Sequence, residues 1–240
     1  MVADLQGAII AAGRGERLRK AVGELPKPLV ELDGETMLSR QARAMLNAGA
    51  SRIVAVINSE TAQLIAERKI QMPPELELIV RDTASSMESL FTVGERLSSG
   101  LFLLATVDAF ISPDEFSRFT FEATGKIGAS GGTRVDGALG VTKWRGDKKP
   151  LFAHVTSAGL ITGLGGEQAS MVTAGIYMMP TRIFELAAEA RSAGLDALRQ
   201  FLTMLIDRGY SLVAIEIADA IDVDEGADLD AARSAIKGGR

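Results

Sequence analysis

Runs of apolar residues alternate with amphipathic stretches through the first half of the chain. Continuous apolar runs at 7–11, 53–57 and 101–107 predict strands that are buried on both faces. Between the first two runs, apolar residues recur at helical spacing over 36–49, and Gly49 suits the end of that helix. Because strands and helices exchange in this order, the pattern predicts a parallel sheet between two layers of helices.

Polar residues mark where several further helices should begin. Ser85 and Glu88, and later Ser112 and Glu115, have the spacing of a capping box, in which the serine caps a helix N-terminus. A series of short extended pieces rich in glycine between 126 and 179 predicts an antiparallel lid. The remaining predicted elements are an extended stretch at 29–32, a helix at 61–68, a strand at 76–80, helices at 181–190 (capped by Thr181) and 197–208, and a strand at 212–217.

Composition is that of an ordinary globular protein and excludes several kinds of chemistry. The 240 residues suffice for one α/β domain, and 47% of them are hydrophobic. A net charge of −5 gives no global attraction to nucleic acid or to an anionic membrane surface. The absence of cysteine excludes disulfides, thiolate metal sites and cysteine nucleophiles. With neither a signal peptide nor an apolar run of membrane-spanning length, we expect a cytoplasmic protein.

The stretch from Ala8 to Val30 carries the strongest chemical signal. Its apolar run passes through Ala11 and Ala12 directly into Gly13-Arg14-Gly15, and Arg17 follows. Glycine accepts positive φ and leaves no side chain between the backbone N–H groups and a ligand. Free N–H groups in such a turn form a concave anion site, to which the arginines add positive charge. The loop is therefore predicted to hold a polyphosphate.

Lys27 follows that loop between two prolines, Pro26 and Pro28. Each proline fixes its own backbone and restricts the residue before it. A lysine held this stiffly loses less conformational freedom when it meets a phosphate. We therefore predict that Lys27 serves the same phosphate site.

Together these residues resemble the nucleotidyltransferase family, whose N-terminal signature is A-A-G-x-G-x-R-L followed by P-K-P-L. The chain reads Ala11-Ala12-Gly13-Arg14-Gly15-Glu16-Arg17-Leu18 and then Pro26-Lys27-Pro28-Leu29. The resemblance, which covers almost the whole chain, implies a three-layer α/β/α Rossmann-like (GT-A-like) fold with a mostly parallel mixed sheet and a small antiparallel lid. It also implies a single domain, with an NTP-binding half at 1–125 and an acceptor-binding half at 126–240 that includes the C-terminal helices.

Two aspartates match the metal-binding positions of this family. Asp108 ends the most hydrophobic strand, and a carboxylate at the carboxyl end of a buried parallel strand lies where ligands bind in open α/β folds. Asp222 lies in the segment Ile221–Leu229, which resembles the family's late D-x-D-T-P-E-D-L segment. That motif is degenerate here, so Asp224 stays open as the second ligand. The resemblance implies that Asp108 and Asp222 hold Mg²⁺, a hard cation that prefers oxygen ligands.

A second loop bears on the choice of substrate. In this family the loop that corresponds to Arg81–Leu90 cradles the base and ribose, so we expect Thr83, Ser85 and Ser86 to bind the nucleotide. Hexose-1-phosphate enzymes usually carry a G-T-A-G-type loop there. The Ser-Ser-Met-x-Ser-Leu of this chain is more similar to enzymes that transfer cytidylyl groups to phospho-alcohols or to molybdopterin.

The third family motif, E-K-P, is missing from its usual place. The family has it shortly before a G-x-Y strand, here Gly175-Ile176-Tyr177, where this chain has Gly165-Gly166-Glu167-Gln168 instead. Lys148-Lys149-Pro150 lies too early to replace it and is interpreted as a solvated turn. The departure further weakens the hexose-phosphate interpretation. Gly175 itself is expected to lie at the acceptor.

The resemblance implies an enzyme that condenses an NTP with a small phosphorylated acceptor and releases pyrophosphate. Arg17, Lys27 and Asp108 are the catalytic candidates, and no general base is needed for an acceptor that is already ionised. CTP with a phospho-alcohol, such as phosphocholine or inositol phosphate, is the preferred pair of substrates. A sugar-1-phosphate with UTP or dTTP is the alternative, followed by a molybdenum cofactor nucleotidyltransferase or a non-catalytic nucleotide-binding protein. The nucleotide-binding candidates are Ala11, Ala12, Gly13, Arg14, Gly15, Thr83, Ser85 and Ser86.

Other protein classes fit the sequence less well. A dinucleotide-dependent oxidoreductase would need a third loop glycine where Leu18 stands, and a P-loop NTPase would need a G-K-[S/T] after the loop. A metal-dependent glycosyltransferase shares the general fold, but its D-x-D belongs in the middle of the domain, whereas Asp222-Val223-Asp224 is near the C-terminus. The region 126–179 could pair two subunits of a homodimer.

Overall fold

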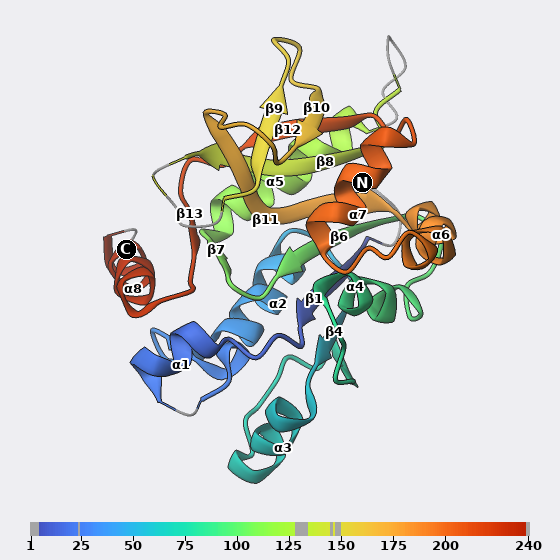
Figure 1. Cartoon of the computed structure of the whole chain (residues 1–240). Helices are drawn as coiled ribbons and strands as arrows, with labels where there is room; N and C mark the ends of the chain where they lie inside the picture. Colours follow the sequence, from blue (N-terminus) through green and yellow to red (C-terminus); the bar gives the residue numbers. More distant parts are fainter. Residues whose placement is uncertain (1–4, 24, 128–133, 145, 147–149, 239–240) are drawn as a thin grey trace.

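The computed structural model describes residues 5–23, 25–127, 134–144, 146 and 150–238. Within these residues, nine strands form one central sheet between two layers of helices (Figure 1). The strands are β1 (Gln6–Ala11), β4 (Arg52–Ile57), β5 (Leu76–Val80), β6 (Leu101–Thr106), β8 (Gly137–Lys143), β9 (Phe152–Val155), β10 (Ile161–Leu164), β11 (Met171–Pro180) and β12 (Leu212–Glu216). Their order is β10-β9-β11-β6-β1-β4-β5, and β8 pairs with both β11 and β12.

The centre of the sheet, β6-β1-β4-β5, is parallel, and its three inner strands are apolar on both faces. Alternate residues of a strand point to opposite faces. In β1, Ile9 joins one hydrophobic cluster and Ile10 the other, and in β4 Ile53 and Val54 divide in the same way. Burial on both sides explains why these strands are continuous apolar runs in the sequence.

Helices cover both faces of this sheet. On one face lie α2 (Met37–Asn47) and α5 (Pro113–Lys126), and on the other lie α4 (Ser86–Gly94) and α7 (Leu198–Asp207). At one end of the molecule α8 (Gly226–Gly238) packs against α1 (Glu16–Val22), so the first and last helices lie side by side (Figure 1). The other helices are α3 (Ser59–Arg68) and α6 (Ala187–Ser192). The predicted α/β fold with three layers and a mixed sheet is confirmed.

The predicted helix starts are confirmed in part. The Ser85 hydroxyl accepts a hydrogen bond from the Glu88 N–H (3.2 Å), and Ser112 caps α5 through the Glu115 N–H (3.3 Å). The reciprocal half of each capping box is replaced by ion pairs, because the Glu88 carboxylate pairs with Arg191 and the Glu115 carboxylate with Arg118. The Arg191–Glu88 pair thus joins α6 to α4, whereas the Arg118–Glu115 pair lies within α5.

The second half of the chain contributes the antiparallel part of the sheet. β11 runs antiparallel to β6, β8 and β9, and the β9–β10 hairpin projects beyond the main body of the sheet (Figure 1). The predicted antiparallel pieces therefore extend the central sheet. β6 precedes residue 125 and β11 follows it, and the two strands pair within one sheet. The proposed division of the chain into two halves at that residue stays a prediction.

Two local predictions are wrong in part, and one falls outside the described residues. Of the extended stretch predicted at 29–32, Leu29 ends a 3-10 helix (Lys27–Leu29), whereas Val30 is extended and leads into the short strand β2 (Glu31–Leu32), which pairs with β3 (Glu35–Thr36). Thr181 is the first residue of a 3-10 helix (Thr181–Leu186), and its hydroxyl accepts a hydrogen bond from the Gly100 N–H instead of capping a long helix. Lys148 and Lys149 lie outside the described residues.

Among the described residues, no helix is both long enough and apolar enough to cross a membrane.

Candidate active site

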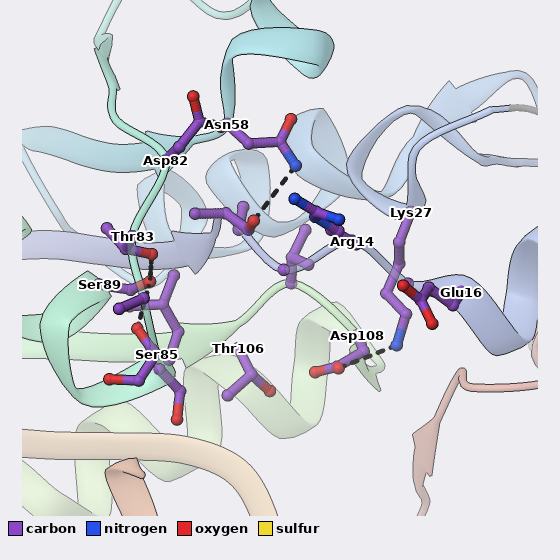
Figure 2. A pocket seen from close by; sticks show the side chains of 18 of the residues that line it. Arg14, Glu16, Lys27, Asn58, Asp82, Thr83, Ser85, Ser89, Thr106 and Asp108 are labelled. Atoms are coloured by element: carbon purple, nitrogen blue, oxygen red, sulfur yellow. Dashed lines mark hydrogen bonds and ion pairs between the residues drawn. The ribbon is translucent and has the colours of Figure 1, made fainter. Parts of the chain in front are cut away.

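A cavity of about 760 Å³ opens at the carboxyl ends of the parallel strands. It is lined by all of the residues that the sequence analysis assigned to the nucleotide and to catalysis. Figure 2 shows the Thr83, Ser85 and Ser89 side chains on one side and Lys27 and Asp108 on the other. The lining consists of Ile10–Arg17, Lys27, Asn58, Asp82–Ser86, Ser89, Thr106–Asp108 and Asp224.

The glycine loop leaves β1 and enters α1 through a left-handed residue. Gly15 has φ 62° and ψ 36°, and it is the residue that precedes α1. A Cβ on Gly15 would lie 2.8 Å from the Cβ of Lys27, so the loop and Lys27 pack in direct contact. The loop is held from the other side by Asn58, whose amide donates to the Ala12 carbonyl oxygen (3.2 Å) (Figure 2).

Replacing Gly15 with alanine is expected to lower stability by about 1–2 kcal/mol, because an L-residue is strained at this positive φ and the new Cβ meets Lys27. The same clash moves Lys27, so nucleotide affinity should fall as well. Gly34→Ala is the matched control, since Gly34 has φ 79° with open space around it. Thermal unfolding and nucleotide titration compare the two. Equal losses of nucleotide affinity in both variants would contradict contact between the loop and Lys27.

Lys27 is the central cation of the site. It is 6% exposed, and its ammonium lies 3.0 Å from Asp108 Oδ2 and 2.6 Å from Asp224 Oδ1. Burial alone would lower the pKa of Lys27, but the charges of Asp108 and Asp224 outweigh it and raise that pKa above its ordinary value. For Asp108, burial opposes ionisation, and the nearby Lys27 charge overcomes it and lowers the pKa of the carboxyl. The lysine and Asp108 are therefore a charged pair at neutral pH.

Three carboxylates meet beside this lysine. Asp108, Asp222 and Asp224 each place an oxygen within 4.8 Å of the others. The strand β13 (Ala220–Asp222) brings the two late aspartates there by pairing antiparallel with β7 (Ala109–Ile111), directly after Asp108. Arg17 pairs with the second carboxylate oxygen of Asp224. Such a group of hard oxygen ligands could hold a divalent cation.

Asp222 is the carboxylate that is least balanced by positive charge. Partial burial, then the negative charges of Asp108 and Asp224, raise the pKa of Asp222 to about 7. Asp222 as a whole is an exposed residue, so solvent screens part of this repulsion. A cation placed between these groups would relieve the crowding of negative charge.

Asp222→Asn should stabilise the metal-free protein at about pH 8 and have almost no effect near pH 4. Because the native pKa of Asp222 lies above its unfolded value, the native state retains this proton longer, and the contribution to stability is lost as the pH rises through about 7. Thermal unfolding in a chelator measures the difference. Asp230→Asn, at an aspartate whose side chain is 79% exposed, is the control. A gain for Asp222→Asn that does not grow with pH would contradict the crowding of the carboxylates.

The segment Asp82–Ser86, here called the serine loop, lines the opposite wall of the cavity, and its hydroxyl groups make hydrogen bonds within the protein. Ser85 caps α4, and the Thr83 and Ser89 hydroxyls lie 2.6 Å apart. The Ser86 hydroxyl accepts a hydrogen bond from the Leu198 N–H (2.9 Å) at the start of α7. Thr83, Ser85 and Ser86 all line the cavity, as expected for nucleotide contacts, and their role stays a prediction.

Gly175 is close to the site without lining the cavity. It has φ 74°, and a Cβ there would lie 2.6 Å from the Ala109 Cβ and 2.7 Å from the Thr106 Oγ1. Glycine is therefore needed for β11 to approach the turn that carries Asp108. Its expected contact with the acceptor stays a prediction.

A comparison with models of known protein families identifies the chain. Residues 7–175 match the model of the MobA-like NTP transferase domain. The chain belongs to this family. The match includes the glycine loop, Lys27, the serine loop and Asp108. The nucleotidyltransferase family predicted from the sequence is thereby confirmed.

This NTP transferase domain is similar to several solved structures and, over shorter stretches of sequence, to curated relatives. The inositol-1-phosphate CTP transferase from T. maritima is 20% identical, with a TM-score of 0.76 over 99% of this chain and 98% of that chain. A UDP-glucose pyrophosphorylase solved with UDP-glucose is 13% identical, with a TM-score of 0.76 over 99% and 100% of the two chains. At these identities the likeness is one of fold. A mannose-1-phosphate guanyltransferase from Pichia angusta is 37% identical over 65 residues, which cover 27% of this chain and 18% of that relative.

Among the cavity residues of this NTP transferase domain that were not predicted from the sequence, Asn58 and Asp82 hold neighbouring segments in place. Asn58 is buried and joins the glycine loop to α3, because its side-chain Oδ1 also accepts a hydrogen bond from the Thr61 N–H (2.8 Å). Asp82 lines the cavity and accepts hydrogen bonds from the backbone and the hydroxyl of Ser59. These two hydrogen bonds outweigh desolvation and lower the pKa of Asp82. Both residues follow the ends of parallel strands, the position that drew attention to Asp108.

Proposed function

We propose that this protein transfers a nucleotidyl group from an NTP to the phosphate of a small phosphorylated acceptor, with release of pyrophosphate. One observation carries the proposal. Lys27 lies between Asp108 and Asp224 and packs against the glycine loop, in one cavity with the serine loop. A cation, carboxylates and a phosphate-type loop that converge in this way suit a reaction between two anions.

The chemistry requires little covalent help from the protein. An acceptor phosphate oxygen attacks the α-phosphorus of the NTP while the bond to the pyrophosphate oxygen breaks. The barrier arises from charge repulsion and alignment, so fixed positive groups lower it. In this proposal the backbone of Gly13–Gly15 and the Arg17 side chain hold the β- and γ-phosphates, and Lys27 contacts the α-phosphate or the acceptor.

We propose Mg²⁺ as the metal, held by Asp108 and Asp222, with Asp224 as the alternative ligand. All three carboxylates offer the hard oxygen atoms that this cation prefers. When bound, Mg²⁺ would neutralise phosphate charge as a Lewis acid. Both oxygens of Asp224 already pair with Lys27 and Arg17, which favours Asp222 as the second ligand.

Cytidylyl transfer to a phospho-alcohol is the preferred form of this reaction. It is supported by the Ser85-Ser86-Met87 loop and by the likeness of fold, over nearly the full length of both chains, to an inositol-1-phosphate CTP transferase. A sugar-1-phosphate acceptor is the second candidate. It is supported by the local sequence identity to mannose-1-phosphate guanyltransferases and a glucose-1-phosphate uridylyltransferase.

A thermal-shift panel of CTP, UTP, dTTP, GTP and ATP, each with and without Mg²⁺, tests the proposal. A ligand at about 100 times its dissociation constant stabilises the native state by roughly 2.7 kcal/mol, which is a measurable shift. A Mg²⁺-dependent shift that is largest for CTP would support cytidylyl transfer, and a preference for UTP, dTTP or GTP would favour a sugar-1-phosphate acceptor. No shift with any of them, under conditions in which the protein is folded, would argue against an NTP site.

A further inference from the structure

The turn that carries Asp108 is held by a side chain outside the cavity. Gln41 lies in the middle of α2 and is 4% exposed. Its amide nitrogen donates to the carbonyl oxygens of Thr106 (3.1 Å) and Ala109 (3.2 Å). These two residues flank the turn at Val107 and Asp108, so one side chain spans the segment that presents the carboxylate.

The Thr106 carbonyl lies where the sheet stops supplying donors. The Val107 N–H donates to the Ile10 carbonyl oxygen (3.2 Å), so Val107 faces β1 and the preceding carbonyl faces the opposite way, toward β11. The pairing of β11 with β6 ends at Ile176 and Ala105, one residue too early. A partly buried carbonyl beyond the end of its ladder needs another donor, and the Gln41 amide provides it.

On the other side of the turn, the Ala109 carbonyl also receives no hydrogen bond from the strand with which its own strand pairs. The Val223 N–H donates to the Asp108 carbonyl oxygen (3.0 Å), which makes this pair a hydrogen-bonded pair of the β7–β13 ladder. In antiparallel pairing the next pair, Ala109 with Asp222, is then not hydrogen-bonded, so the Ala109 carbonyl faces away from β13. Gln41 thus donates to the end of β6 in the central sheet and to the start of β7 in the small β7–β13 sheet, on either side of the turn that carries Asp108.

We propose that Gln41 is a positioning residue, which fixes the Asp108 carboxylate relative to Asp222 and Asp224 and so sets the affinity for the divalent cation. The inference rests on the proposed metal-dependent transfer, and it assigns to Gln41 no contact with substrate. Loss of its two hydrogen bonds frees the turn to rotate, which moves the Asp108 carboxylate within the cluster. Groups that orient metal ligands from behind typically change affinity or activity by about 10- to 100-fold when removed.

Gln41→Met tests this role, because methionine fills a similar volume without donating a hydrogen bond. The matched control is Met45→Ala on the same helix. Met45 is also buried, but its side chain packs against Gly7 in β1, away from the turn. We would titrate wild type and both variants with Mn²⁺ alone, and then measure kcat and KM separately at a temperature where all three are folded.

We expect Gln41→Met to lose about 10-fold or more in Mn²⁺ affinity and in kcat, with KM for the nucleotide little changed, and Met45→Ala to keep the wild-type values. If Gln41→Met fails to fold, Gln41→Leu, which also donates no hydrogen bond, replaces it in the same titrations.

Two results separate this inference from the proposed function. Unchanged Mn²⁺ affinity in the Gln41 variants, or an equal loss in Met45→Ala, overturns the role of Gln41 even if wild type is an active transferase. Conversely, loss of Mn²⁺ affinity in Gln41→Met supports that role even if wild type releases no pyrophosphate, a result that would contradict the proposed function alone.

Discussion

Lys27→Met lowers nucleotidyl transfer by about 1000-fold or more while the chain stays folded. Lys27 is the buried cation of the cavity, and its ammonium contacts Asp108 and Asp224. A phosphate that reacts there would lose its fixed counter-charge. Without this charge the two carboxylates also repel each other, so we expect stability to fall by about 2 kcal/mol in the absence of metal.

Steady-state pyrophosphate release and thermal unfolding measure both effects. The control is Lys20→Met, since Lys20 is an exposed lysine on α1 beyond the cavity lining. Addition of Mg²⁺ should restore part of the lost stability of Lys27→Met, because a cation can then separate the carboxylates. Turnover near the wild-type rate in Lys27→Met would refute the role of this residue at phosphate.

Asp108→Asn should have an effect of the same size, for a different reason. The substitution keeps the shape of the side chain but removes a negative charge from the three-carboxylate group. We expect Mg²⁺-dependent stabilisation by the nucleotide to disappear and turnover to fall by about 1000-fold. The matched control is Asp114→Asn, at an exposed aspartate in the first turn of α5.

Turnover and Mg²⁺-dependent binding report on two separate roles of Asp108. Loss of turnover with retained Mg²⁺-dependent binding would place Asp108 in catalysis but not in metal binding. Retained turnover would contradict both roles. Isothermal titration with Mg²⁺ and nucleotide, performed beside the activity assay, distinguishes these outcomes.

Elements whose signal is local could be predicted from the sequence. The strand at 53–57 is apolar on every position because helices cover both faces of it. Thr36 and Ser85 cap their helices because short hydroxyl side chains reach the free N–H groups of the first turn. The glycine loop could also be predicted, because the left-handed backbone at Gly15 favours glycine over other residues.

Contacts between distant segments could not be predicted in this way. The sequence analysis left Asp224 as the alternative second metal ligand and did not predict its ion pair with Lys27. That pair forms because β13, near the C-terminus, joins β7 in the middle of the chain. Gln41 lies on a buried face of α2 at a position where the helical pattern expects an apolar side chain. The end of the β6–β11 ladder and the pairing of β7 with β13 explain why a donor is needed there, and neither is visible in the sequence.

Errors of local prediction arose where tertiary contacts override propensity. Leu29 was predicted to begin an extended stretch, but it ends a 3-10 helix (Lys27–Leu29) that starts directly after Pro26. That turn brings the lysine side chain into contact with Gly15 and the carboxylates. The Glu88 carboxylate pairs with Arg191 from α6 and the Glu115 carboxylate with Arg118 of its own helix, because these charge-assisted bonds are stronger than the second hydrogen bond of a capping box.

The most direct test of the account follows the α-phosphate of the nucleotide. Wild type is incubated with α-labelled CTP, Mg²⁺ and, in separate reactions, phosphocholine, inositol-1-phosphate and a set of sugar-1-phosphates, with Asp108→Asn as the blank. The account predicts that the label moves onto one acceptor class while unlabelled pyrophosphate leaves in equal amount. Release of the terminal phosphate as inorganic phosphate, or transfer that persists in Asp108→Asn, would contradict it.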